Sequence, residues 1–139
     1  MSEVRHFLGS TQTIEVVLDG AATGGELALM TLRMPPGAGS PLHRHTLETE
    51  TLVVRDGLLA VEVEGERREL GPGGAVHLRR GVLHSFVSER GAVVDVLVVP
   101  AGLEDFFRTI CPLEPDAPAA DPAVTAAALE RHGLDFSGT

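Results

Sequence analysis

Short apolar segments separated by turn residues constrain the fold of this chain more than any other feature of its sequence. Turns rich in Gly or Pro, such as PPGAGSP (35–41), and the acidic turn EGER (64–67) lie between them. The segments are TIEVVLD (13–19), ELALMTLRM (26–34), ETLVVRD (50–56), LLAVEVEG (58–65), AVHL (75–78), VLHSFVS (82–88) and AVVDVLVV (92–99). Strands of this length and spacing predict an all-β sandwich or barrel.

The length of the chain limits this fold to a single domain. Its 139 residues suit one hydrophobic core, and 43% hydrophobic residues against 22% charged residues are typical of a globular protein. No internal repeat is present. We expect the β core to span 13–100, within a unit 1–111 that also contains an N-terminal strand extension and a first C-terminal helix.

The residues after Pro100 have a different character and predict helices. Leu103, Phe106, Phe107 and Ile110 follow helical spacing, and Pro112 ends that segment. Four prolines mark 112–122 as a linker, after which 122–132 is a short helix, with an aspartate before it and a glycine after it. We therefore expect a C-terminal tail, 112–139, that packs on the outside of the β unit or on a neighbouring subunit.

Charge and cysteine content argue against several classes of function. The formal net charge is −9 and no run of basic residues occurs, so the chain as a whole would repel a phosphate backbone, and we expect no nucleic-acid partner. No segment has the length and apolarity of a membrane span or the pattern of a secretory signal, so we expect no membrane partner. With one cysteine and no intramolecular disulfide, the expected location is the cytoplasm.

The most informative polar stretch is GAGSPLHRHTLETETLVVRDG, residues 37–57. His43 and His45 project from the same face of a strand beginning near residue 42, roughly 6–7 Å apart at the backbone, and can converge on one cation. Glu50 can join them either along an uninterrupted strand or from the next strand after a bend at 46–47. Imidazole and carboxylate ligands suit divalent Fe, Mn, Ni, Co, Cu or Zn.

A third histidine, His84, lies 39 residues after His45 and follows a glycine turn at the start of another strand. Two spaced motifs contain these residues. The first reads G, five residues, H-x-H, four residues, E, six residues, G, from Gly37 to Gly57. The second reads G, five residues, R-x-G, two residues, H, from Gly73 to His84, with Ser88 four residues later.

These motifs resemble those of the cupin family. All fixed positions of the first cupin motif match, whereas the second has Arg79 where the family has proline and Ser88 where it has asparagine. The resemblance implies a jelly-roll barrel with one divalent transition metal ion. Its implied protein ligands are His43, His45, Glu50 and His84, which leave coordination positions open. The tail is similar to those of small bacterial cupins described as quercetin-dioxygenase-like, and small cupins commonly form homodimers through sheet edges.

Other residues are candidates for a pocket beside the metal. Met34 and Leu52 lie on apolar strand faces that line either the core or such a pocket, and Phe86 shares a face with His84. Asp95 interrupts an apolar strand and must face solvent, face the cavity or be paired. We interpret Glu48, whose spacing from the histidines is wrong for a ligand, as a solvated carboxylate at the rim.

The leading functional hypothesis is a metal-dependent, dioxygenase-like oxidoreductase that acts on a small, partly apolar chelating substrate. Glu50 has a possible second role as a catalytic base that leaves the metal. The absence of Trp and Tyr and the presence of only five Phe argue against a large flavonoid substrate. Two alternatives remain: a non-catalytic barrel that binds a metal and a small molecule, and an isomerase or lyase that uses its metal without oxygen.

Overall fold

The computed structural model describes residues 5–8, 12–114, 117–118 and 120–137, with side chains described from residue 12 onward. Its strands belong to two sheets, and two helices precede the last, two-residue strand. They are β1 (Arg5–Leu8), β2 (Gln12–Leu18), α1 (Gly20–Thr23), β3 (Ala28–Met34), β4 (Ala38–His45), β5 (Thr49–Gly57), β6 (Leu59–Val63), β7 (Glu66–Leu70), β8 (Ala75–Leu78), β9 (His84–Ser88), β10 (Ala92–Val99), α2 (Leu103–Ile110), α3 (Pro122–Arg131) and β11 (Leu134–Asp135).

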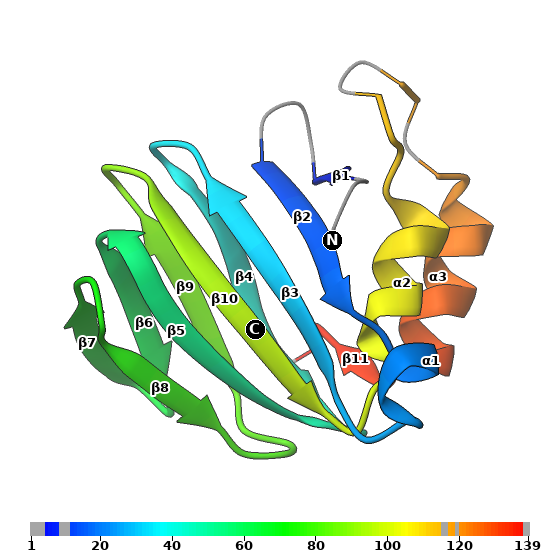
Figure 1. Cartoon of the computed structure of the whole chain (residues 1–139), viewed down its shortest axis with the longest axis horizontal. Coiled ribbons are helices and arrows are strands. Elements are labelled where there is room, and N and C mark those ends of the chain that lie inside the picture. The colour runs from blue at the N-terminus through cyan, green and yellow to red at the C-terminus, as the bar shows by residue number, and fades with distance from the viewer. Residues whose placement is uncertain (1–4, 9–11, 115–116, 119, 138–139) are drawn as a thin grey trace.

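The strands form two antiparallel sheets that face each other (Figure 1). Within the described residues, one sheet has the order β1-β2-β3-β10-β5-β8 and the other the order β11-β4-β9-β6-β7. From β3 to β10 the chain passes repeatedly from one sheet to the other, so strands adjacent in space are not consecutive in sequence, except in the hairpin of β6 and β7. This is a jelly-roll, and the predicted all-β class is confirmed.

The core fills the space between the sheets because successive side chains of a strand point to opposite faces, so every second residue faces inward. In β10, for example, Val94, Val96 and Val98 are buried and point inward. Many of the core residues come from the predicted segments, including Ile14, Met30, Leu32, Leu52, Val54, Leu59, Val61, Val76 and Leu78.

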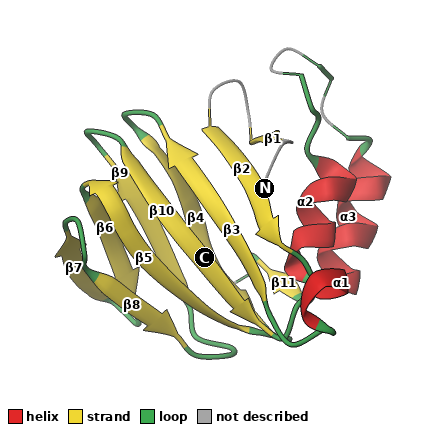
Figure 2. Cartoon of the chain, viewed as in Figure 1, coloured by secondary structure: helices red, strands yellow, loops and turns green. Residues whose placement is uncertain are grey.

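The helices gather at one edge of the two sheets (Figure 2). α2 and α3 lie side by side there, and α2 buries Leu103 and Phe106 in the core cluster. None of the helices in the described ranges is long and apolar enough to cross a membrane.

The described part of the tail packs back on the β unit through α3 and β11. Ala128 of α3 is fully buried, and β11 adds a strand to the five-stranded sheet beside β4. The predicted tail helix therefore exists, but the tail also forms a strand that the sequence did not indicate.

Candidate metal centre

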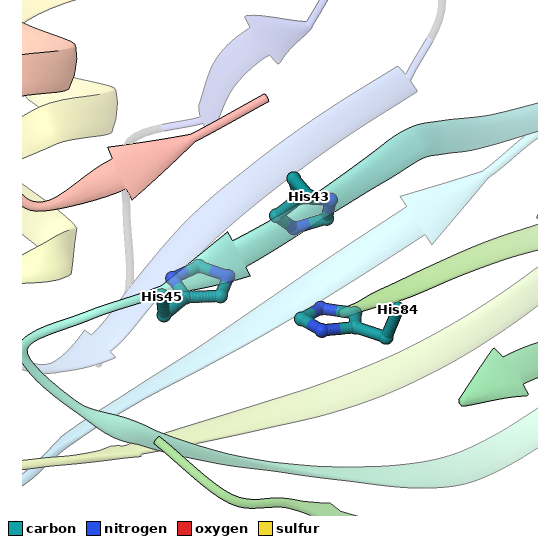
Figure 3. A group of neighbouring side chains, drawn as sticks. All are labelled: His43, His45 and His84. Atoms are coloured by element: carbon teal, nitrogen blue, oxygen red, sulfur yellow. The ribbon is translucent and has the colours of Figure 1, made fainter. Parts of the chain in front are cut away.

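Three histidines from two neighbouring strands converge inside the barrel (Figure 3). His43 and His45 lie on β4, and His84, the first residue of β9, pairs directly with His43. All three are buried, and one ring nitrogen of each lies within 4.8 Å of those of the other two. The H-x-H spacing therefore does place both imidazoles on one face, and the register of β9 brings the third to them.

Glu50 faces the histidines from the opposite sheet. It is the second residue of β5, which begins after a bend at 46–48, so of the two routes considered the chain takes the bend. Its Oε1 lies 3.3 Å from Nε2 of His84 and 3.5 Å from Nε2 of His45. The carboxylate thus closes the group of histidines across the interior of the barrel.

Backbone carbonyls fix the tautomer of two of the rings. Nδ1 of His43 lies 2.7 Å from the carbonyl oxygen of Pro41, and Nδ1 of His84 lies 3.2 Å from that of Val82. A carbonyl only accepts, so in both rings Nδ1 carries the proton and donates it. Nε2 is left with its lone pair, which is the form of imidazole that binds a metal.

The inward-facing atoms lack partners in the described part of the chain. Nε2 of His45, Nε2 of His84 and Oε1 of Glu50 are buried without a hydrogen bond. Such burial is costly unless something satisfies these groups. Two imidazole nitrogens and a carboxylate oxygen around one point, with His43 beside them, fit a divalent transition metal ion.

Burial also prepares these groups to act as ligands. Desolvation lowers the pKa of His43 to about 4 and lowers that of His45 below its ordinary value, so both rings are neutral at pH 7. Burial alone would raise the pKa of the Glu50 carboxyl, but the facing imidazoles of His45 and His84, when protonated, lower it overall. A carboxylate that faces the neutral rings of His43 and His45 is in a protonation state that can bind a metal.

Glu48 is buried, which corrects its interpretation as a solvated rim carboxylate. Its side chain turns inward from the bend before β5, and its Oε2 lies 3.9 Å from Nδ1 of His45. Both atoms are buried without a hydrogen-bond partner in the described residues. Burial raises the pKa of Glu48 to about 7. His45 therefore differs from the other two rings, because a carboxyl group and not a carbonyl faces its outer nitrogen.

A cavity of about 400 Å³ opens beside His43, His45 and Glu50. Leu52 and Phe86 line it, as the sequence suggested. Among the described lining residues the other polar side chains are neutral, and no arginine or aspartate occurs. The cavity is thus an apolar space with the candidate metal centre in its wall.

Met34 and Asp95, two of the predicted pocket residues, do not line this cavity. Met34 is buried near the far end of β3, beside a separate hollow. Asp95 alternates with the inward valines of β10 and points outward, where it accepts a hydrogen bond from Thr31 Oγ1 at 3.1 Å and lies 3.6 Å from Arg55 Nε. Asp95 therefore lies on the outer face of β10.

Several lining residues were not expected from the sequence. α2, α3 and β11 contribute one wall, and four of the five phenylalanines line the cavity: Phe86, Phe106, Phe107 and Phe136. The scarcity of aromatic residues therefore does not describe this site. The sequence signal for this wall is the apolar stripe of the first C-terminal helix, but the stripe does not indicate which surface the helix covers.

Ser40 is a further lining residue that the motifs do not include. A register shift between Ser40 and His43 marks a bulge in β4, so residues three apart both face the cavity. The hydroxyl of Ser40 is buried without a hydrogen-bond partner in the described residues.

The fold and this site define a jelly-roll β-barrel domain with a candidate metal centre of three histidines and a facing carboxylate. The cupin domain family matches residues 30–100, and the chain belongs to this family. It is 30% identical over 120 residues to quercetin 2,3-dioxygenase of Bacillus subtilis (strain 168), which covers 79% of this chain. The chain spans about a third of that protein's length, 35%.

Solved structures share the fold at low sequence identity. KdgF from Halomonas sp. matches with a TM-score of 0.67 and 22% identity, covering 74% of this chain and 93% of that one. An RmlC-like cupin from Shewanella frigidimarina NCIMB 400 matches with a TM-score of 0.66 and 22% identity, covering 76% and 89%. Oxalate decarboxylase from Bacillus subtilis matches with a TM-score of 0.61 and 22% identity, covering 73% and 30%.

Proposed function

We propose that this protein is a metal-dependent, dioxygenase-like oxidoreductase whose substrate is small, partly apolar and able to chelate the metal. One divalent transition metal ion is held by His43, His45, Glu50 and His84. The observation that carries the proposal is the buried, unpartnered set of Nε2 and Oε1 atoms beside an apolar cavity. The distant likeness to a quercetin 2,3-dioxygenase supports the reaction class.

The bound ion would supply Lewis-acid chemistry and, if it is redox-active, activation of dioxygen. The chain's own residues supply orientation and proton transfer. Pro41 and Val82 hold two of the imidazoles through their carbonyl oxygens, and the apolar walls exclude water from the substrate. The buried carboxylate of Glu50 is positioned to take a proton from a substrate hydroxyl or an acidic C–H group.

Other catalytic strategies find little support in this chain. The sequence contains no lysine and no tyrosine, so neither a Schiff base with a lysine nor a phenolic acid is available. Within the described lining, Glu50 is the only carboxylate. A non-oxidative isomerase or lyase is the second candidate, because Glu50 can act as a base without dioxygen.

Metal content tests the ligand assignment. Protein purified from unsupplemented cells is analysed for metals, together with His84→Ala, Glu50→Ala and the control His77→Ala, whose exposed ring bonds Thr51 on β5. We expect close to one equivalent of metal in wild type and His77→Ala, and at least a tenfold loss in His84→Ala. Equal metal in all four proteins would refute the assignment.

Dioxygen uptake tests the reaction class. Iron-loaded protein is given 2,4-pentanedione or catechol in an oxygen-electrode cell, and we expect uptake that His84→Ala abolishes. Turnover of a chelating substrate without oxygen uptake would favour the isomerase or lyase, and the absence of turnover with every metal and substrate would favour a binding protein.

A further inference from the structure

One wall of the cavity is built by α2 and the C-terminal tail, which both lie outside the residues that match the cupin family. Phe106, Phe107 and Ile110 of α2 and Leu129 of α3 form an apolar wall there. The rings of Phe106 and Phe107 meet edge to face, with centroids 5.3 Å apart. The tail thus contributes to the site and does not merely cover the outside of the barrel.

The end of the tail is tied to the strand that holds two of the histidines. Leu134 and Asp135 of β11 pair with His45 and Arg44 of β4. The carbonyl oxygen of Gly133 accepts hydrogen bonds from both the backbone N–H and the hydroxyl of Thr46, each at 2.9 Å. These contacts fix the position of the chain just before its last aromatic residue.

Phe136 lies at the junction of the apolar wall and the metal centre. Its ring stacks on that of His43, with centroids 5.1 Å apart and an angle of 23° between the planes. The side chain also lines the cavity and remains 38% exposed. Part of this ring is therefore available to a ligand beside the proposed metal position.

We propose that α2 and the tail form a subsite for a flat, uncharged ring and that Phe136 determines the specificity of this subsite. The subsite gives the ring edge-on and stacking contacts with phenylalanines, and no charged side chain other than Glu50 lines the described cavity. The inference rests on the proposed function in one respect, namely that a chelating group of the same ligand binds the metal. It names the substrate class as a ring that bears its chelating oxygens on one edge.

Two probes test the subsite and the metal separately. N-phenyl-1-naphthylamine is an uncharged aromatic dye that fluoresces in apolar sites, and acetohydroxamic acid is a chelator without a ring. Dye binding is measured on metal-free protein, and acetohydroxamic acid binding on cobalt-loaded protein. The variants are Phe136→Ala, Phe136→Leu and the control Val124→Ala, which changes an exposed apolar residue of α3 that does not line the cavity.

We expect Phe136→Ala to weaken dye binding about 3- to 10-fold, because an aromatic contact is lost. Phe136→Leu should weaken it less, and both variants should bind acetohydroxamic acid within twofold of wild type. In cobalt-loaded wild type, the ring chelator tropolone should displace the dye, whereas acetohydroxamic acid should not.

Three results would each overturn the ring subsite. The first is unchanged dye binding in Phe136→Ala, and the second is an equal loss of dye binding in Val124→Ala. The third is that tropolone fails to displace the dye although acetohydroxamic acid binds. If cobalt-loaded wild type binds neither chelator while Phe136→Ala still weakens the dye, the metal assignment fails and the subsite stands as a binding site for a ring alone.

Discussion

At the scale of single residues, the three histidines differ in what holds their outer nitrogens. Carbonyl oxygens hold His43 and His84, and these acceptors do not change with pH. His45 faces Glu48, a group that takes up and releases a proton. The candidate centre therefore contains one histidine whose outer nitrogen faces a titratable carboxyl group, and we expect Glu48 to affect both metal binding and the stability of the metal-free protein.

Glu48→Gln should stabilise the metal-free protein at high pH. Because the pKa of Glu48 is about 7 in the folded state against an ordinary value of 4.5, the folded state binds more protons between these pH values. The contribution of Glu48 to the free energy of unfolding is therefore lowest above pH 7, where the folded protein holds this carboxylate as a buried charge. Urea unfolding with a chelator present should show the variant more stable by on the order of 2 kcal/mol at pH 8 and little different at pH 4.5.

The same substitution should weaken metal binding. When Nε2 of His45 holds an ion, Nδ1 carries a proton and a carboxylate is its best acceptor. We expect roughly a tenfold loss of affinity in Glu48→Gln, measured by competition with a chelator. Glu89→Gln, an exposed control, should change neither property. A variant that loses stability at pH 8, or binds metal as wild type does, would contradict this role of Glu48.

At the scale of elements, apolar and β-branched segments were predicted from the sequence and polar ones were missed. β7 (ERREL) is not among the predicted segments, because only Leu70 of its five residues is apolar and packs against the core, and the strand lies at a sheet edge. α1 is a single turn capped by Asp19, and β11 has two residues that form a strand only because β4 is beside them. The local sequence pattern predicts helices and strands that have a buried apolar face. It does not predict strands that form only because a neighbouring strand pairs with them.

The glycines of the two motifs have different structural roles. Gly57 has φ +82°, and a Cβ there would lie 2.1 Å from the carbonyl oxygen of Gly91, where β5 ends beside the start of β10. Gly73 has a similar φ of +88°, but nothing lies within 4 Å of a Cβ. Position 57 requires glycine both for its backbone angle and because the backbone of Gly91 lies so close, whereas position 73 requires glycine only for its backbone angle.

Gly57→Ala and Gly73→Ala therefore form a matched pair. Gly73→Ala should lower the free energy of unfolding by about 1–2 kcal/mol, the cost of a left-handed backbone for alanine. Gly57→Ala should cost at least about 2 kcal/mol more, because the backbone of β10 must move. Chemical denaturation gives both values, and equal losses would show that the contact with Gly91 does not restrict this position.

At the scale of the whole molecule, the site depends on the closure of the two sheets. The spacing of His43 and His45 was enough to predict that these two lie together, because both belong to one strand. The approach of Glu50 from the opposite sheet, the inward turn of Glu48 and the apolar wall of the tail follow from contacts between elements far apart in sequence. No local period encodes such contacts, so the motif identified the candidate ligands, whereas the lining of the cavity could be found only from the fold.

Since the candidate ligands come from both sheets, metal binding should stabilise the entire fold. A metal that binds only the folded state at 100 times its dissociation constant adds about 2.7 kcal/mol, which corresponds to roughly 10 °C in Tm for a chain of this size. Differential scanning fluorimetry with and without metal should show this shift in wild type and in His77→Ala. His84→Ala should show almost none.

The pH range of this stabilisation follows from the histidines. The pKa of His43 is lowered to about 4 and that of His45 is also lowered, so at these two rings protons compete with the metal below the ordinary pH range of imidazole. In the metal-free protein, these rings bind protons near pH 6.5 in the unfolded state but only at lower pH in the folded state. Their contribution to the free energy of unfolding therefore decreases as the pH falls from 6.5 towards 4. The metal-induced shift in Tm should therefore persist at pH 6 and disappear near pH 4. A shift already lost at pH 6 would mean that these rings titrate as exposed histidines do, and that the ion is held elsewhere.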